Sequence, residues 1–303
     1  MNTTILAGAL EKARSIEIRT RKAVQEQLSG GFRSIFRGRG MDFDEVREYV
    51  PGDDVRAIDW SVTARAGRPF VKKFREEREL TIILAIDVSA SGDFGSLDQT
   101  KRERSAELAC VLALAGLRSR DKVGLLLFSD SVERFIPAQN GRGHVLRLVQ
   151  EILTVSPRGH GTDIAGALDY INRVTRRRAA VLLLSDLHVH EPEALRALTR
   201  ALAATASRHE LVTLWVHDPH ELELPNVGTL TLEDAETGEL LVLDSARARV
   251  RQGYRQAVLA QRNSVKALLD AVGTRTLEIS TNGDYLPALI HFFSARGRSR
   301  GVS

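Results

Sequence analysis

The 303-residue chain has one cysteine, few aromatic residues and no uninterrupted apolar run of the length that a membrane span requires. Cys110 has no second cysteine to pair with, which excludes an internal disulfide and indicates a reducing compartment. The first ten residues lack a basic start and lead directly into Glu11 and Lys12, so a signal peptide is not expected. These absences predict a cytoplasmic protein without a membrane span.

Features typical of nucleic-acid and nucleotide binding are scarce as well. Aromatic residues make up 5% of the chain, whereas proteins that bind single-stranded nucleic acids rely on aromatic rings for stacking. Basic clusters occur at residues 33–39 and at Arg176–Arg178, but a helix end that favours cations explains the second. The net charge is only +4, and no Gly-x-x-x-x-Gly-Lys-Ser/Thr loop is present. Neither nucleic acid nor ATP is therefore expected as a ligand.

From residue 81 onward, short apolar stretches rich in branched side chains alternate with longer amphipathic stretches. The first kind predicts buried β-strands, and the second kind predicts helices. Strands are expected at residues 81–87, 122–128, 133–136, 179–185, 210–216 and 275–280. Helices are expected at about 100–119, 143–155, 163–176, 192–207, 246–271 and 285–295. This order predicts an α/β fold with a doubly wound, mostly parallel sheet flanked by helices.

The same patterns divide the chain into three parts. Residues 1–79 are expected to form an N-terminal helix, over about residues 1–30, and a charged arm of short strands. Residues 80–296 are expected to form the sheet domain, with a β-hairpin insertion at about 226–244, and residues 297–303 a flexible tail. In the arm, Tyr49 and Trp60 are expected to anchor a partly buried network of ion pairs that holds the arm against the sheet domain.

The expected strand at residues 81–87 ends on an acid, Asp87, and two alternating hydroxyl groups follow, from Ser89 and Ser91. Open α/β sheets bind ligands just beyond the carboxyl ends of their strands. Ligand sets made only of oxygen atoms suit Mg²⁺ or Ca²⁺ better than zinc or copper. On this segment alone, a helix cap made by the same residues explains the pattern equally well.

Two further segments extend this pattern. Thr162 lies in a glycine-rich turn, and Asp186 follows a later apolar stretch. Each on its own is explained by a structural role, Thr162 as a helix N-cap and Asp186 as a turn acid. Taken together with Asp87, Ser89 and Ser91, they resemble the metal-ion-dependent adhesion site of von Willebrand factor A domains, with all five positions filled.

This resemblance implies how a metal ion would be held. The hydroxyls of Ser89, Ser91 and Thr162 would bind Mg²⁺ directly, whereas Asp87 and Asp186 would hold coordinated waters and orient the hydroxyls. One coordination position would stay open for a carboxylate from a partner protein. A site rich in hydroxyl groups also accepts Mn²⁺ or Ca²⁺.

A second resemblance runs from about residue 30 to the end of the chain. It rests on Gly52-Asp-Asp-Val-Arg-Ala-Ile-Asp-Trp60, Lys101-Arg102-Glu103, Asp218-Pro219 and Asp234-x-Glu236-Thr237-Gly238. These segments are similar to those of the bacterial family called domain of unknown function 58, which is von Willebrand factor A-like. The resemblance implies an adaptor that often works with a MoxR-type AAA+ ATPase, and it implies no known reaction.

Together the two resemblances imply a non-enzymatic, metal-dependent protein-interaction module, in which an acidic side chain of an unknown client protein completes the coordination of the metal. The alternative is a metal-dependent phosphoester hydrolase that uses Asp87 and Asp186. If Asp87 were a phosphoryl-accepting nucleophile, as in haloacid-dehalogenase-type phosphatases, that chemistry would need a second acid two residues later and a lysine near the later aspartate. Residue 89 is a serine and no lysine is near Asp186 in the sequence, so hydrolysis is disfavoured.

Four histidines follow two strands that are expected to end at the same edge of the sheet. They are His188, His190, His217 and His220. Imidazole groups bind zinc, but histidine pairs in loops without a fixed spacing are common on protein surfaces. A second metal site is not predicted from them.

Overall fold

The computed structural model describes residues 41–51, 53–76, 79–96, 99–189 and 191–294, together with Ser15. Apart from Ser15, the expected N-terminal helix lies outside the described residues, as do the basic segment 33–39 and the tail 297–303. Among the described residues, none of the helices combines the length and the apolar character of a membrane span.

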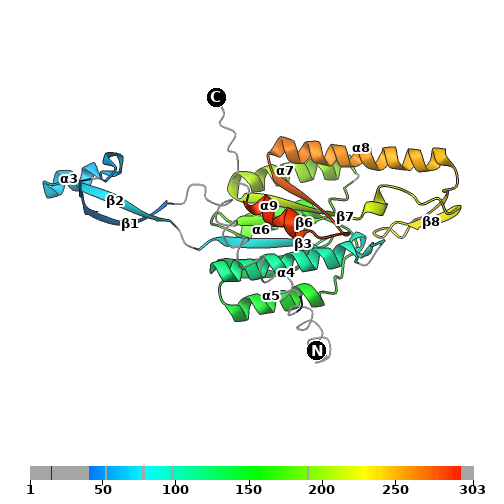
Figure 1. The fold of residues 1–303 in the computed structure, drawn as a ribbon, viewed down its shortest axis with the longest axis horizontal. Helices are drawn as coiled ribbons and strands as arrows, with labels where there is room; N and C mark the ends of the chain where they lie inside the picture. The colour runs from blue at the N-terminus through cyan, green and yellow to red at the C-terminus, as the bar shows by residue number, and fades with distance from the viewer. Residues whose placement is uncertain are drawn as a thin grey trace.

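Six strands form the central sheet in the order β10-β7-β6-β3-β4-β5 (Figure 1). They are β3 (Thr81–Asp87), β4 (Lys122–Phe128), β5 (Val132–Gln139), β6 (Ala180–Ser185), β7 (Glu210–His217) and β10 (Arg275–Ser280). Neighbouring strands are parallel except β4 and β5, which pair antiparallel at one edge. From β3 the chain first builds β4 and β5 on one side and then β6, β7 and β10 on the other. The direction of winding therefore reverses between β3 and β6.

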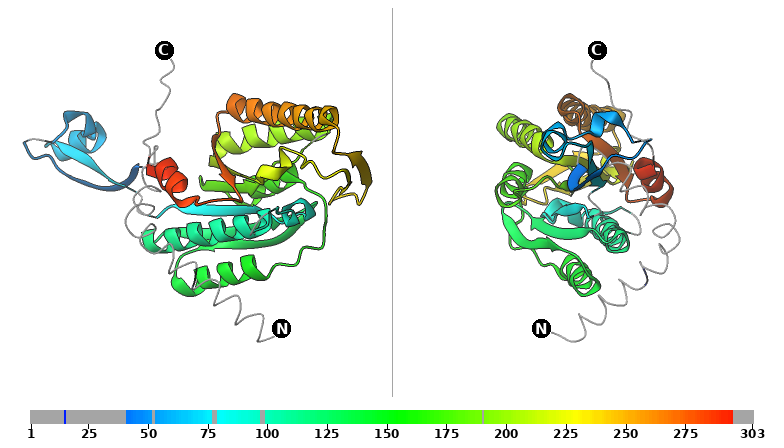
Figure 2. Two further views of the ribbon diagram at one scale, coloured as in Figure 1. Left: turned by 45° about the vertical axis from the view of Figure 1, so that its right-hand side comes forward. Right: turned by 90° about the vertical axis from the view of Figure 1, so that its left-hand side faces the viewer.

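Both faces of the sheet are buried because its central strands are apolar at successive positions. Ile82, Leu84 and Ile86 face one hydrophobic cluster, whereas Ile83 and Ala85 face the other. Helices α4 (Lys101–Ser119), α5 (Arg142–Thr154) and α9 (Leu286–Ser294) cover the first face (Figure 1). Helices α6 (Ile164–Val174), α7 (Pro192–Arg208) and α8 (Ala248–Val272) cover the second (Figure 2). Strands buried on both faces are typical of parallel sheets.

Helix α4 is fixed at its start and packed closely along its length. The hydroxyl of Thr100 accepts a hydrogen bond from the Glu103 N–H, and the Glu103 carboxylate accepts one from the Thr100 N–H, which makes a capping box. Farther along, a Cβ added to Gly116 would lie 2.6 Å from Cγ2 of Val123, so glycine allows α4 to approach β4 closely. These contacts place the first residue of the helix, Lys101, at the carboxyl edge of the sheet.

The predicted fold class is confirmed. Each strand and helix expected from residue 81 onward is present, and β5 extends the short strand expected at 133–136. The expected hairpin is β8 (Thr229–Glu233) paired antiparallel with β9 (Leu240–Asp244). In its turn, Gly238 has a φ of 72°, a left-handed conformation that favours glycine.

The arm differs from the sequence-based expectation. Strands β1 (Met41–Glu48) and β2 (Phe70–Glu76) pair antiparallel, and helix α3 (Trp60–Ala66) lies between them in the chain. Figures 1 and 2 show this arm projecting away from the sheet domain. Trp60 is 70% exposed. The prediction that Trp60 anchors the arm against the sheet domain is therefore wrong.

Two ion pairs, Arg47–Asp53 and Arg68–Glu48, join residues of the arm to one another instead. Arg47 binds Asp53 through two hydrogen bonds of 2.8 and 2.5 Å. The N–H of Tyr49 donates a hydrogen bond of 2.9 Å within the arm. Trp60 is the first residue of α3, directly after the N-cap Asp59, and this position leaves the indole on the outside. The local contacts hold the arm together without Trp60.

Candidate functional site

The candidate site lies where β3 and β6 end side by side. Asp87 is the last residue of β3, and Ser185 is the last residue of β6. The Ser185 hydroxyl donates a hydrogen bond of 2.7 Å to Oδ2 of Asp87, and the N–H of Ser89 donates one of 3.0 Å to Oδ1. Because the winding reverses between these two strands, this is the position at which open α/β sheets bind ligands.

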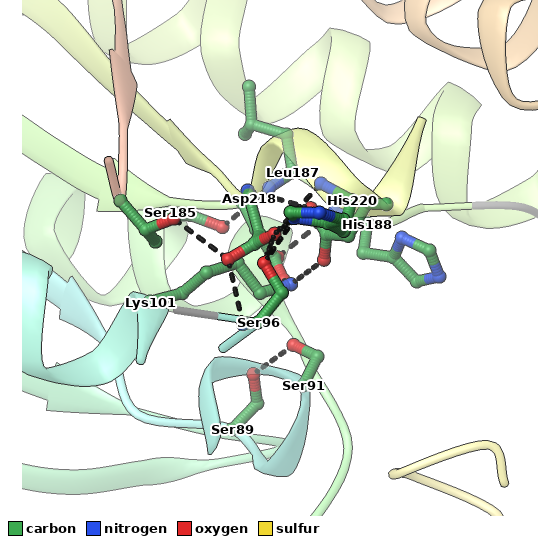
Figure 3. Close-up of polar contacts among 12 residues, drawn as sticks. Ser89, Ser91, Ser96, Lys101, Ser185, Leu187, His188, Asp218 and His220 are labelled. Carbon is green, nitrogen blue, oxygen red and sulfur yellow. Dashed lines mark hydrogen bonds and ion pairs between the residues drawn. The ribbon is translucent and has the colours of Figure 1, made fainter. Parts of the chain in front are cut away.

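The hydroxyls of Ser89 and Ser91 belong to the same cluster. Their oxygens lie 3.1 Å apart and both residues are buried (Figure 3). The N–H of Ser89 donates to Asp87, and Ser91 and Asp186 line the same cavity. The structure thus brings together Asp87, Ser89, Ser91 and Asp186. The cavity that these residues line has a volume of about 10 Å³, which is about the space of one water molecule.

The negative charge of Asp186 disfavours the charge of Asp87. Burial and the negative charge of Asp186 raise the pKa of Asp87 to about 6, although hydrogen bonds from Ser89 and Ser185 oppose the shift. Buried acids that lie close together remain charged only where a cation or hydrogen-bond donors compensate them. The cluster is therefore built to attract a cation.

That cation is the ammonium group of Lys101. Its Nζ lies 2.6 Å from Oδ2 of Asp186 and also pairs with Glu221, and the Lys101 side chain is 4% exposed. Burial lowers the pKa of Lys101, but the two carboxylates outweigh burial and raise it. Burial likewise raises the pKa of Asp186, but Lys101 outweighs burial and lowers it. Each group therefore stabilises the charge of the other.

Lys101 is a site residue that sequence reasoning missed. It lies 85 residues before Asp186 in the chain, and its place in the family segment Lys101-Arg102-Glu103 was a signal that could have identified it. The expectation that no lysine lies near Asp186 is wrong in three dimensions. Hydrolysis of this kind remains disfavoured because residue 89 is a serine, where a second acid is needed.

The fifth predicted residue, Thr162, contacts the hairpin instead. Its hydroxyl donates a hydrogen bond of 2.6 Å to Oε1 of Glu236, in the turn between β8 and β9. The loop that carries Thr162 still borders the cluster, because the N–H of Ala90 donates a hydrogen bond of 2.9 Å to the carbonyl of His160. The N-cap of α6 is Asp163, so the alternative role of Thr162 as an N-cap is wrong.

The turn that presents Glu236 is itself ordered. The Asp234 carboxylate accepts hydrogen bonds of 2.9 Å from the N–H groups of Glu236 and Thr237. These contacts explain the segment Asp234-x-Glu236-Thr237-Gly238, because it forms the turn that directs Glu236 toward Thr162. The position of Thr162 is thus set by a hairpin far away in the sequence.

The glycine-rich loop before Thr162 is held by Glu133. This carboxylate accepts hydrogen bonds from the Ser129 hydroxyl at 2.7 Å and from the N–H groups of Arg158 and Gly159 at 2.9 Å each. Burial raises the pKa of Glu133, but these hydrogen bonds outweigh burial and lower it from 4.5 to about 2. The charged carboxylate therefore stabilises the loop.

We expect Glu133→Gln to lower the free energy of unfolding at pH 7 by about 1–3 kcal/mol, because an amide accepts these hydrogen bonds more weakly. The contribution of the carboxylate is fully present above the unfolded pKa of 4.5 and is lost as the pH falls through about 2. Urea denaturation across this range should show the two proteins converging at low pH. Glu151→Gln, which removes a surface partner of Arg134, is the matched control with little effect. A difference that does not change with pH would contradict this role.

A further buried acid, Asp218, joins the loop before α4 to the ends of β7 and β10. Its carboxylate accepts hydrogen bonds from the N–H and hydroxyl of Ser96, from the N–H of His220 at 2.9 Å and from the hydroxyl of Thr281 at 2.8 Å (Figure 3). Nδ1 of His220 lies 2.6 Å from the Ser96 hydroxyl. His220 thus supports this loop.

The histidines form no metal cluster within the part of the chain that the structure describes. The described side chains include no group of three or more histidine, cysteine, aspartate or glutamate residues suited to a metal ion. His190 lies outside the described residues.

The chain matches the family described as "Protein of unknown function DUF58" over residues 45–264. The chain belongs to this family. The DUF58 chain is 33% identical over 297 residues to Uncharacterized protein Rv1480 of Mycobacterium tuberculosis, which covers 97% of this chain and 90% of the relative. It has the same identity and coverage with Uncharacterized protein Mb1516 of Mycobacterium bovis.

Solved structures similar to this DUF58 chain include BatB from Bacteroides thetaiotaomicron, with a TM-score of 0.47 at 19% identity over 73% of this chain and 100% of that one. The SpRpn10 VWA domain has a TM-score of 0.38 at 12% identity over 70% of this chain and 94% of that one. At these identities the similarity concerns the fold alone.

Proposed function

We propose that this chain is a protein-interaction module whose contact site is the carboxyl edge of the sheet around Asp87, Ser89, Ser91 and Asp186. The observation that carries the proposal is the meeting of two buried acids and two hydroxyls from β3 and β6 at the reversal of winding. Ligands of open α/β sheets bind at this edge, and the ligand that we propose here is another protein.

The proposed module binds a divalent cation, with Mg²⁺ as the first candidate and Mn²⁺ or Ca²⁺ as alternatives. The donor set fits such an ion, since it offers only oxygen atoms and already attracts the cationic Lys101. Ser89 and Ser91 would bind the ion directly, Asp87 and Asp186 would orient its waters, and Thr162 would join after leaving Glu236. The bound ion would supply an electrophilic centre for a carboxylate of the partner.

The proposed partner in the cytoplasm is a MoxR-type AAA+ ATPase. In this scheme the ATPase supplies mechanical work, and the module presents a client protein that offers an acidic side chain. The chain has no phosphate-binding loop of the Gly-x-x-x-x-Gly-Lys-Ser/Thr type, which is consistent with a separate ATPase subunit.

Capture of the ATPase from native extract tests this proposal. Retention on the immobilised full chain in Mg²⁺ buffer is expected to fall about tenfold or more when EDTA is added or when Asp87→Asn replaces the wild type, since the coordinating acid is lost. Asp169→Asn, on the exposed side of α6, is the matched control and should retain the ATPase. Equal retention with and without metal would contradict the metal bridge. No retention under any condition would contradict the choice of partner.

A further inference from the structure

We propose that the Lys101 ammonium and a divalent metal ion are alternative occupants of this site, so that Lys101 sets the metal affinity of the resting chain. This inference rests on the proposed function, because it concerns the same cluster. It adds a residue that the adhesion-site pattern does not include. The resting site is then closed by a side chain of the protein itself.

The first support is the position of the ammonium group. Nζ of Lys101 lies 2.6 Å from Oδ2 of Asp186, one of the two acids predicted to act on the metal. The cavity at this point holds about one water-sized sphere. Two cations in so small a space would repel each other strongly across a poorly hydrated site. Entry of a metal ion therefore requires the ammonium to leave Asp186.

The second support is that the Lys101 ammonium has an alternative partner. Its ammonium also pairs with Glu221, whose side chain is 27% exposed and therefore nearer to water. The Glu221 carboxylate is held in turn by the N–H of Asp218 at 3.1 Å. The centre of the Phe94 ring lies 5.9 Å from Nζ of Lys101, which offers a cation–π contact. Rotation of the flexible lysine side chain can thus free Asp186 without unfolding α4.

The third support is the fixed origin of the side chain. Lys101 is the first residue of α4, which begins with the Thr100–Glu103 capping box. Because the capping box fixes the backbone at the start of α4, occupancy of the site by the ammonium depends on the conformation of the Lys101 side chain. A metal ion would then meet one local competitor, with which it exchanges at Asp186.

The test is direct titration of the full chain with Mn²⁺, followed by electron paramagnetic resonance of the free ion and by calorimetry. Lys101→Met is expected to bind Mn²⁺ roughly 5- to 150-fold more tightly than the wild type, the usual range of coupling between competing events. Mg²⁺ should displace the bound Mn²⁺ in the variant. Since methionine leaves Glu221 without its partner, Lys101→Met/Glu221→Gln provides a second variant in which Asp186 stays free for the metal.

Lys122→Met is the matched control. It removes one positive charge at the start of β4, where the exposed ammonium pairs with Glu79 at 3.0 Å. Its gain in affinity should be much smaller. An equal gain would mean that net charge alone sets the affinity and would overturn the proposal, as would a lack of any gain in both Lys101 variants. Tight metal binding by Lys101→Met combined with metal-independent capture of the ATPase would instead uphold this inference and refute the metal-bridged function.

Discussion

Lys101→Met is expected to lower the free energy of unfolding in metal-free buffer by about 3–5 kcal/mol, because breaking a buried ion pair leaves an uncompensated charge. The side chains of Lys101 and Asp186 are only 4% and 6% exposed, so water cannot replace the ammonium at low cost. Glu221 is more exposed and contributes less of the loss. Urea denaturation, followed by circular dichroism, measures the change.

A double variant separates the charge from the packing. In Lys101→Met/Asp186→Asn the second substitution removes the uncompensated carboxylate, and replacement of a buried ion pair by neutral groups is often close to neutral. Most of the lost stability should therefore return. Lys266→Met, which breaks an exposed pair with Glu278, should cost no more than about 0.5 kcal/mol. If the double variant is as unstable as the single one, the Lys101–Asp186 charge pair does not explain the loss.

Asp218→Ala is expected to lower the free energy of unfolding by about 2–4 kcal/mol, since each buried donor left without an acceptor costs about 1–3 kcal/mol. The carboxylate is fully buried and accepts hydrogen bonds from Ser96, His220 and Thr281. Ser96 and His220 regain water when the carboxylate is removed, whereas Thr281 is buried. The loss should therefore fall below the sum over all donors.

The pH dependence of this effect has a definite sign. Burial raises the pKa of Asp218, but the hydrogen bonds from Ser96, His220 and Thr281 outweigh burial and lower it. The stability that it contributes is therefore present above the unfolded pKa of 3.8 and is lost as the pH falls below that value. Denaturation at neutral and at acidic pH measures the difference, with exposed Asp169→Ala as the control. Full stability of Asp218→Ala at neutral pH would show that Asp218 does not hold these segments together.

The sheet could be predicted from the sequence because its strands have few alternatives. A run such as residues 82–86, apolar at every position, is stable only when both faces are covered. The approach of Asp87 to Asp186 follows from two parallel strands that end at the same edge. The buried strands and their shared edge are therefore sufficient to predict most of the site.

The cation and the fifth residue could not be predicted in this way. Lys101 reaches Asp186 only because of how α4 lies over the sheet edge, and local sequence patterns do not encode this packing. The direction of the Thr162 hydroxyl depends on Glu236, 74 residues later. The prediction that Trp60 anchors the arm was wrong for another reason. Large aromatic residues are usually buried, but Trp60 begins a helix on a projecting arm.

The distances along the chain between contacting residues have a consequence for biosynthesis. Asp87 meets Ser185 across 98 residues, Lys101 meets Glu221 across 120, and Arg104 binds the carbonyl of Thr281 across 177. During translation the N-terminal half emerges first, so β3 and α4 leave the ribosome before the strands that they contact have been made. Contacts between distant segments also slow folding. A nascent chain that ends before residue 221 thus carries Lys101 without one of its two acids, and the cluster is completed only after Glu221 has been made.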